Sequence, residues 1–455
     1  MRAAILAFLL AALCSAAEFR FGRAEVKITP TTETGGVKPV LDELHAMAAV
    51  FEKDGKMAAM AGVDLPVVNR PVVEEARRLI EKETGIPAGN TMISATHSHT
   101  GLTPGWAGTS SWPSLTPARA GKQVEEASRY TAFLSKAIAQ AVGAAYRDRQ
   151  PALISAAVGQ EDNLAFNRRF LMKDGTAQFN PGLMNPDIVR PLGPTDASVS
   201  VVYVETTDRK PLATFVNHAL HLDTVGGEVY SADYPYTLAK LLGAVKGPEM
   251  LTVFTIGTAG NINHLDVKAP GPQRGPEEAA RIGTILAAAV LKAYKGLDPL
   301  DVTQVRVTRE TVPLPPVELK PGDAEKAREY LARENSGKSL SLLERVFTQR
   351  VLFSERQQGR PFDVEVQAIA LGKNLAWVGL PGEVFVEIGL AIKQNSPFRY
   401  TTINELAYDW IRYVPNRKAF AEGHYEATNT RCGPGGGEAL AEGAIRCLLR
   451  LHSAQ

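Results

Sequence analysis

Short apolar runs alternate with longer amphipathic segments along most of this chain. Pairs of apolar runs separated by a short polar turn occur within residues 44–65, 199–217 and 362–380, which is the pattern of β-hairpins. Between them, segments such as 72–84 and 124–146 carry apolar residues at helical spacing. Because strands and helices alternate while some strands also pair as hairpins, the sequence predicts an α/β (mixed α+β) fold with a mixed β-sheet core flanked by helices. No linker divides the chain, so we expect a single large domain.

The composition is that of an ordinary globular protein and indicates no charged partner. The chain has 455 residues, of which 45% are hydrophobic and 22% charged, and its formal net charge is +1. This balance gives no electrostatic basis for binding nucleic acid or an anionic membrane. After residue 17, no stretch is apolar enough for a membrane-spanning helix. We therefore expect a soluble protein with no nucleic-acid partner and no transmembrane segment.

The first 17 residues have the pattern of a secretory signal peptide. Arg2 precedes an apolar run over residues 3–13, and small residues follow at 15–17. The sequence therefore predicts a secreted or periplasmic protein. In such an oxidising compartment, the remaining pair of cysteines, Cys432 and Cys447, favours a disulfide, with two separate thiols as the alternative.

Two histidines end one of the apolar runs. His97 and His99 follow residues 92–96, and side chains two positions apart in an extended chain point the same way. Two imidazoles on one side of a strand end suit a divalent transition metal, with zinc as the default. On local spacing alone, hydrogen bonds within the loop explain the pair equally well. A catalytic zinc site needs further ligands from elsewhere in the chain.

Later strand ends carry further candidates for the same site. His218 and His221 follow another apolar run. Because they are three positions apart, they face opposite ways in an extended chain, and we expect only one of them to reach a metal. Glu383 follows a buried-type run in the same manner, and the small residues at 257–260 allow the backbone to approach a ligand or another strand closely.

Six short motifs occur in an order that resembles the neutral/alkaline (non-lysosomal) ceramidase family. They are Ser-Ala-Thr-His-Ser-His-Thr-Gly at 94–101, Asn-Arg at 167–168, Val-Asn-His-Ala-Leu-His at 216–221, Gly-Thr-Ala-Gly-Asn-Ile-Asn at 257–263, Leu-Pro-Gly-Glu at 380–383, and Tyr-Val-Pro at 413–415 followed by Tyr-Glu at 425–426. Each motif is weak alone, but the ordered set covers nearly the whole chain after residue 17. The resemblance implies that residues 18–455 form a ceramidase-like catalytic domain.

The resemblance implies a zinc-dependent amide hydrolase and assigns roles to seven residues. The zinc ligands that it implies are His97, His221, Glu383 and Tyr413, while His99 and Arg168 contact the substrate amide and Tyr425 lines the site. Bound zinc acidifies water and polarises a carbonyl. The implied reaction is hydrolysis of an N-acyl amide, such as ceramide to sphingosine and a fatty acid, and the implied partner is a small amphipathic, lipid-like amide reached by peripheral membrane contact.

The chain departs from the family pattern in three places. Asn263 stands where the ceramidases carry a serine, Trp410 stands at the first tyrosine of their Tyr-x-x-Tyr segment, and no C-terminal immunoglobulin-like domain follows. These departures bear on the substrate more than on the metal. Two alternatives therefore stand beside a ceramidase: a zinc hydrolase of the same fold that acts on a different amide or ester, and an exported, non-catalytic binding protein.

Overall fold

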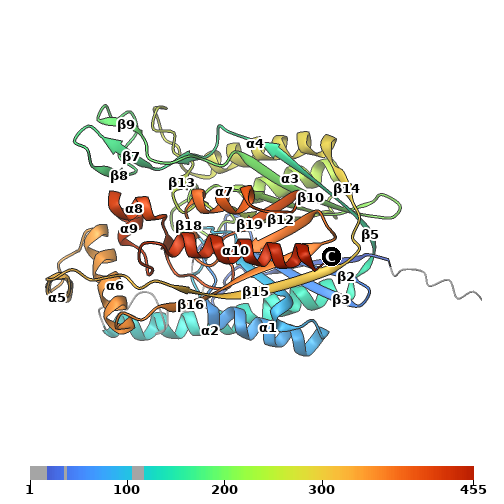
Figure 1. Cartoon of the computed structure of the whole chain (residues 1–455), viewed down its shortest axis with the longest axis horizontal. Helices are drawn as coiled ribbons and strands as arrows, with labels where there is room; N and C mark the ends of the chain where they lie inside the picture. Colours follow the sequence, from blue (N-terminus) through green and yellow to red (C-terminus); the bar gives the residue numbers. More distant parts are fainter. Residues whose placement is uncertain (1–17, 35–37, 105–116, 455) are drawn as a thin grey trace, which may run out of the picture.

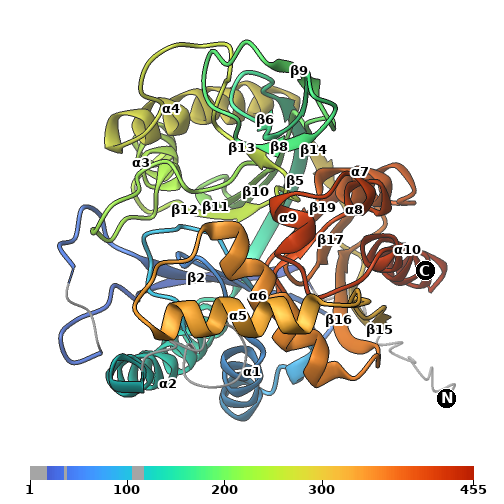
Figure 2. The ribbon, with the colours of Figure 1, turned by 90° about the vertical axis from the view of Figure 1, so that its left-hand side faces the viewer.

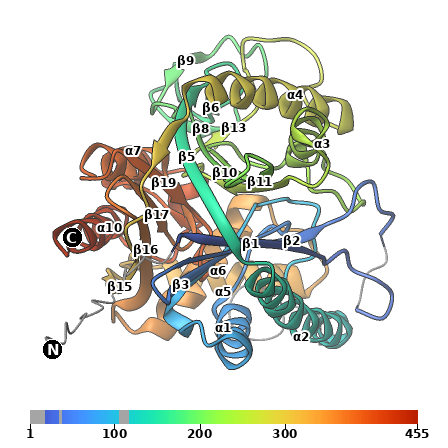
Figure 3. The ribbon, with the colours of Figure 1, turned by 90° about the vertical axis from the view of Figure 1, so that its right-hand side faces the viewer.

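A large mixed sheet forms the centre of the computed structural model, which describes residues 18–34, 38–104 and 117–454 (Figure 1). The predicted signal peptide, residues 1–17, lies outside the described residues. Among the described residues, this sheet has the strand order β12 (Leu251–Ile256), β11 (Pro211–His218), β10 (Ser198–Thr206), β5 (Gln150–Gln160), β1 (Arg20–Lys27), β2 (His45–Lys53), β3 (Lys56–Val63) and β4 (Thr91–Ala95), with β14 (Asp298–Leu300) paired to β5. The long strand β5 joins its two halves (Figure 3).

A second sheet packs against the first. It consists of β15 (Val305–Leu314), β16 (Phe362–Leu371), β17 (Leu375–Gly379) and β19 (Tyr400–Asn404). Between the two sheets lies an aromatic core in which the Trp377 ring is 5.5 Å from Phe51 and 5.7 Å from Phe215. Face-to-face packing of this kind holds the strand ends of both sheets in fixed relative positions.

Helices surround the two sheets, and some of them pack on other helices instead of on strands. The helices of the described residues are α1 (Arg70–Thr84), α2 (Pro117–Arg147), α3 (Tyr234–Lys246), α4 (Pro276–Ala293), α5 (Asp323–Asn335), α6 (Leu342–Gln357), α7 (Val386–Gln394), α8 (Arg417–Glu422), α9 (Tyr425–Thr428) and α10 (Gly436–Ser453). In Figures 2 and 3, α1 and α2 lie on one side of the strands and α3 and α4 on the other, while α7 and α10 cover the second sheet. Within the described ranges, we find no helix with both the length and the apolar character of a membrane span.

The mixed fold predicted from the sequence is confirmed, including its hairpins. β2 and β3 pair antiparallel across Asp54 and Gly55, whose positive φ values of 50° and 73° suit a two-residue turn. β10 pairs antiparallel with β11, and β16 pairs antiparallel with β17. β3 and β4, β11 and β12, and β17 and β19 are parallel, so the sheets are mixed.

Three small sheets stand beside the large ones and carry polar side chains. They are β6 (Phe166–Asn167) with β13 (Ile262–Asn263), β18 (Glu383–Val384) with β20 (Tyr413–Val414), and β7 (Arg169–Met172) between β8 (Ala177–Phe179) and β9 (Ile188–Pro191). The first two link segments that are far apart in the sequence, and the small sheets contribute part of the site described below.

The predicted disulfide between Cys432 and Cys447 is wrong, because both residues are buried free thiols. Cys432 packs against the first turn of α10, where a Cβ at Gly436 would lie 2.7 Å from its Sγ. Cys447 lies in the third turn beyond that point, roughly 16 Å further along the helix axis. A disulfide needs Cα atoms within about 7 Å of each other, so the helix keeps the two thiols apart.

Candidate metal centre

Three imidazole rings meet at the ends of β4 and β11. His97 Nε2 lies 3.0 Å from His221 Nε2 and 3.2 Å from His99 Nε2, and one nitrogen of each ring lies within 4.8 Å of the others. His97 and His221 are buried, whereas His99 is exposed. This is the group of side chains in the described part of the chain that is spaced to hold a metal ion.

The backbone brings His97 and His99 together by a turn and not by strand alternation. β4 ends at Ala95, and His97 has a positive φ of 81°, which is uncommon for a residue with a side chain. The His97 N–H donates to Leu65 O at 2.9 Å, and the His99 N–H donates to Leu222 O at 3.0 Å. The predicted convergence of the two rings is therefore present, but the predicted reason for it is wrong. Unusual backbone of this kind is concentrated at functional sites.

The hydrogen bonds of the buried rings fix which nitrogen faces the cluster. His97 Nδ1 lies 2.6 Å from Pro66 O, and His221 Nδ1 lies 2.9 Å from Ala259 O. A carbonyl oxygen only accepts, so Nδ1 of each neutral ring must carry the proton and Nε2 must present a lone pair. Burial, together with the charge of Arg168, lowers the pKa of His221 to about 4, which keeps this ring neutral at neutral pH.

Glu383 supplies a carboxylate to the same point. Its Oε2 lies 3.4 Å from His97 Nε2 and 3.5 Å from His221 Nε2, and among the described residues it is buried without a hydrogen-bond partner. Two lone pairs and a carboxylate oxygen facing one another repel unless a cation lies between them.

The spacing of these atoms fits a zinc ion. Two ligands of a tetrahedral zinc at about 2.0–2.1 Å lie roughly 3.3 Å from each other. The Nε2 atom of His97 lies 3.0 Å from Nε2 of His221 and 3.2 Å from Nε2 of His99. Glu383 Oε2 lies 3.4 Å from Nε2 of His97 and 3.5 Å from Nε2 of His221. The hydrogen bonds from Nδ1 to carbonyl oxygens are those that metal-binding histidines ordinarily make. The donor set present therefore fits zinc, and His99 fits either a ligand position or a substrate-facing one.

Tyr413 enters the site beside Glu383. The two are direct partners in the parallel pairing of β18 with β20, so their side chains leave adjacent strands at the same level. Burial, followed by the charge of Glu383, holds the pKa of the Tyr413 phenol well above its usual range. Tyr413 is therefore a neutral phenol unless a cation favours its ionised form. The Tyr425 ring lies 5.4 Å from Tyr413, and Asn429 Nδ2 donates to the Tyr425 hydroxyl at 3.2 Å.

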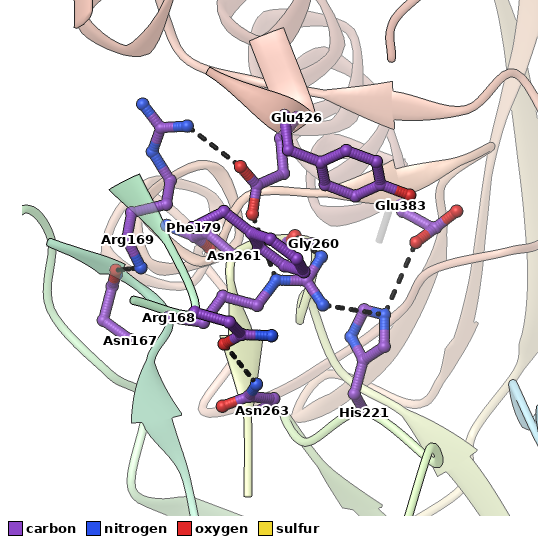
Figure 4. Close-up of polar contacts among 12 residues, drawn as sticks. Asn167, Arg168, Arg169, Phe179, His221, Gly260, Asn261, Asn263, Glu383 and Glu426 are labelled. Carbon is purple, nitrogen blue, oxygen red and sulfur yellow. Dashed lines mark hydrogen bonds and ion pairs between the residues drawn. The ribbon is translucent and has the colours of Figure 1, made fainter. Parts of the chain in front are cut away.

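Arg168 brings a permanent positive charge to the edge of the cluster (Figure 4). Its Nη1 lies 3.3 Å from His221 Nε2, its Nη2 donates to Gly260 O at 2.7 Å, and its Nε pairs with Glu426 Oε1 at 3.1 Å. The guanidinium is held on three sides and is 3% exposed. A buried, immobilised arginine beside a metal site is suited to stabilise negative charge that develops on a bound molecule.

Glu426 holds Arg168 and Arg169 together. Its second oxygen, Oε2, pairs with Arg169 Nη1 at 2.9 Å, and the Glu426 side chain is 0% exposed. Arg169 also pairs with Glu422 at 3.2 Å. No pattern in the sequence pointed to Glu426; once Arg168 and Arg169 are known to be buried, a buried acid is expected to pair with them.

Replacement of Glu426 by alanine is expected to destabilise the protein by about 3–5 kcal/mol, because it leaves two arginines buried without their shared counter-charge. Denaturant unfolding followed by circular dichroism measures the change. Glu75→Ala is the matched control, since it removes a carboxylate from the exposed ion pair with Arg78 and should leave the unfolding midpoint unchanged. Equal midpoints for both variants would contradict the structural role of Glu426.

Close backbone approach at residue 260 places the strand ends next to one another. A Cβ added to Gly260 would lie 2.4 Å from Glu383 O, so only glycine fits there. The small residues at 257–260 predicted such an approach to a ligand or another strand, and the neighbour is the backbone of β18. Asn263 is 0% exposed and bonds to Asn180 Oδ1 at 2.9 Å, where it ties β13 to the neighbouring loop.

All seven predicted site residues therefore lie in one region. The structure brings together His97, His99, His221, Glu383, Arg168, Tyr413 and Tyr425. His218 does not join them, because its Nδ1 bonds to Ser198 O at 3.1 Å on the other side of the strand. One neighbour was noted in the sequence only as a departure from the family pattern: Trp410 Nε1 donates to Glu383 Oε1 at 3.0 Å.

Comparison with solved structures gives strong likenesses to two ceramidases. The neutral ceramidase from Pseudomonas aeruginosa matches with a TM-score of 0.71 and 16% sequence identity, over 96% of this chain and 75% of that one. A structure described as a ceramidase complexed with C2 matches with a TM-score of 0.71 and 17% identity, over 96% of this chain and 76% of that one.

This chain has a neutral ceramidase-like fold. Neither protein-family models nor curated protein sequences give a match, so the likeness lies in the structure. At such low identity it establishes the fold, and the chemistry of this chain must be argued from its own residues. The seven predicted site residues nevertheless lie in one region of this fold.

Proposed function

We propose that this protein is an exported, zinc-dependent amidohydrolase of the neutral ceramidase type that hydrolyses an N-acyl amide. One observation carries the proposal: two imidazole lone pairs, from His97 and His221, and the unpartnered Oε2 of Glu383 face a common point. This is the donor set of a catalytic zinc site with room for a further ligand. The fold shared with the two ceramidases supports the choice of an amide as substrate.

The proposed zinc ligands are His97, His221, Glu383 and Tyr413. When bound there, zinc acts as a Lewis acid that lowers the pKa of water to about 7 and polarises a carbonyl group. The pairing of Nδ1 with carbonyl oxygens holds His97 and His221 in the orientation and tautomer that such binding requires. Tyr413, a neutral phenol in the structure without metal, would lose its proton on binding.

His99 and Arg168 are the proposed donors to the substrate oxygen. His99 is exposed, so its ring can meet a bound carbonyl. Arg168 carries donors only and is fixed by Gly260 and Glu426. Both would strengthen their hydrogen bonds as negative charge develops on the oxygen, which lowers the barrier to hydrolysis. Tyr425, next to Tyr413, would line the site.

The substrate proposed is a small amphipathic, lipid-like amide, with ceramide as the leading candidate. Because such molecules reside in membranes, the protein would contact a membrane peripherally, after export directed by residues 1–17. Zinc content together with hydrolysis of a fluorogenic N-acyl sphingosine tests the proposal. About one zinc per chain with turnover supports it. Zinc with turnover only of other amides or esters would indicate a different substrate, and zinc-free, inactive protein would overturn it.

A further inference from the structure

We infer that Trp410 is a positioning residue of the metal centre: its indole N–H fixes one oxygen of Glu383 and so turns the other toward the imidazoles. The inference rests on the proposed metal site and adds to it a residue that makes no contact with the metal itself. It concerns the position where the ceramidase pattern has a tyrosine and this chain has a tryptophan.

The two carboxylate oxygens of Glu383 have different partners. Trp410 Nε1 donates to Oε1 at 3.0 Å, while Oε2 has no hydrogen-bond partner among the described residues and lies 3.4 Å from His97 Nε2. An indole carries one donor and no acceptor, so this contact can form in one direction only. Hydrogen bonds to a carboxylate are among the stronger ones in proteins. The result is a carboxylate with one oxygen occupied and one oxygen available.

The backbone holds Trp410 and Glu383 at a fixed separation. The Gly382 N–H donates to Asp409 O at 3.0 Å, and the Glu383 N–H donates to Arg412 O at 2.9 Å. Trp410 lies between Asp409 and Arg412 in the sequence. The backbone on each side of Trp410 is therefore hydrogen-bonded to the segment that carries Glu383. Neither partner can shift without breaking these bonds, and rigid support of this kind preorganises a ligand.

Side chains hold the indole ring in place as well. The Arg412 guanidinium lies 4.3 Å from the centre of the Trp410 ring, within the range of a cation–π contact. Asp409 Oδ1 accepts hydrogen bonds from two backbone groups, the main-chain N–H of Trp410 at 2.9 Å and the main-chain N–H of Arg70 at 3.2 Å. Arg412 has a positive φ of 69°, an uncommon conformation that tertiary contacts must maintain. Arg412 therefore contacts one face of the indole ring, and Asp409 fixes the backbone of Trp410.

Loss of the indole N–H should weaken metal binding without unfolding the protein. A carboxylate with both oxygens free rotates among orientations, and metal binding must then select one of them, whereas the bonded carboxylate is already aligned. Residues that hydrogen-bond to a metal ligand typically contribute 10–100-fold to metal affinity. Trp410→Phe keeps most of the ring and removes the donor. It should bind zinc 10–100-fold more weakly than the parent, while the metal-free variant stays folded with a cooperative thermal transition whose midpoint is lowered by the lost hydrogen bond.

Zinc affinity is measured by competition with a chelator, and tryptophan emission is recorded during the titration. In the parent protein, zinc should alter the emission of Trp410 because the charge on its carboxylate partner is neutralised. Trp377→Phe is the matched control. Trp377 is 1% exposed in the core between the sheets and stacks on Phe51, so this variant should lose stability yet keep the parental zinc affinity and emission change.

The outcomes separate the inference from the proposed function. If the parent chain itself takes up no zinc, the proposed metal centre fails and the inference fails with it. If the parent binds zinc and Trp410→Phe binds it within twofold of the parent affinity, the proposed function stands and the role of Trp410 is refuted. Weaker binding by Trp410→Phe alone, with Trp377→Phe at parental affinity, supports the inference.

Discussion

His97→Ala and His221→Ala are each expected to purify without bound zinc and without measurable amide hydrolysis. Each substitution removes an imidazole whose Nε2 faces the other at 3.0 Å and whose Nδ1 is already bonded to a carbonyl oxygen. Each variant leaves one imidazole beside Glu383 and Tyr413, so the site loses one of its two nitrogen ligands and its zinc affinity should fall too far to hold the ion through purification. Elemental analysis of chelator-free preparations measures zinc per chain, and Glu383→Ala should show the same loss.

His218→Ala provides the matched control for these variants. It removes a buried histidine from the same segment, three residues before His221, but its ring bonds to Ser198 O away from the cluster. Its zinc content should therefore equal that of the parent even if its stability falls. Full zinc in both His97→Ala and His221→Ala would contradict the proposed metal centre, and loss of zinc in His218→Ala would show that destabilisation alone is enough to release the metal.

His99→Ala is expected to keep its zinc and to lower kcat by roughly 10²–10³-fold, the usual cost of removing one oxyanion donor. The effect should fall mainly on kcat, because the proposed hydrogen bond strengthens only as charge develops on the substrate oxygen. Arg168→Ala should behave similarly, and Glu426 retains Arg169 as its partner in that variant. Zinc content and steady-state kinetics on the same preparations measure both effects.

The double variant of His99 and Arg168 tests whether both donors serve one oxygen. If they do, its loss in kcat should be smaller than the product of the single losses, because the two positions are energetically coupled. A His99→Ala protein that loses its metal together with its activity would instead make His99 a zinc ligand. The spacing of 3.2 Å between His99 Nε2 and His97 Nε2 permits that result, and Tyr413 would then be the assignment to reconsider.

Local sequence patterns determined the secondary structure and the strand ends where the site lies. Asp54-Gly55 specifies a tight turn because both residues tolerate positive φ. Helix α1 begins after Asn69, whose side chain accepts from the Val72 N–H, and ends at Gly85 with a φ of 71°. Each of these signals acts over a few residues, so it is readable without knowing the fold. The predicted histidines and Glu383 were found the same way, as polar residues following buried strands.

Only the tertiary structure decided how these strand ends are supported. Arg168 and Glu426 are 258 residues apart in the chain, and Trp410 is 27 residues from Glu383, so no local period or spacing links them. The same holds for the two cysteines, which the length of α10 separates although an oxidising compartment favours their pairing. Contacts of this kind depend on the packing of one sheet against the other. The sequence by itself therefore predicted the candidate site residues, and the packed structure determined which residues hold them in position.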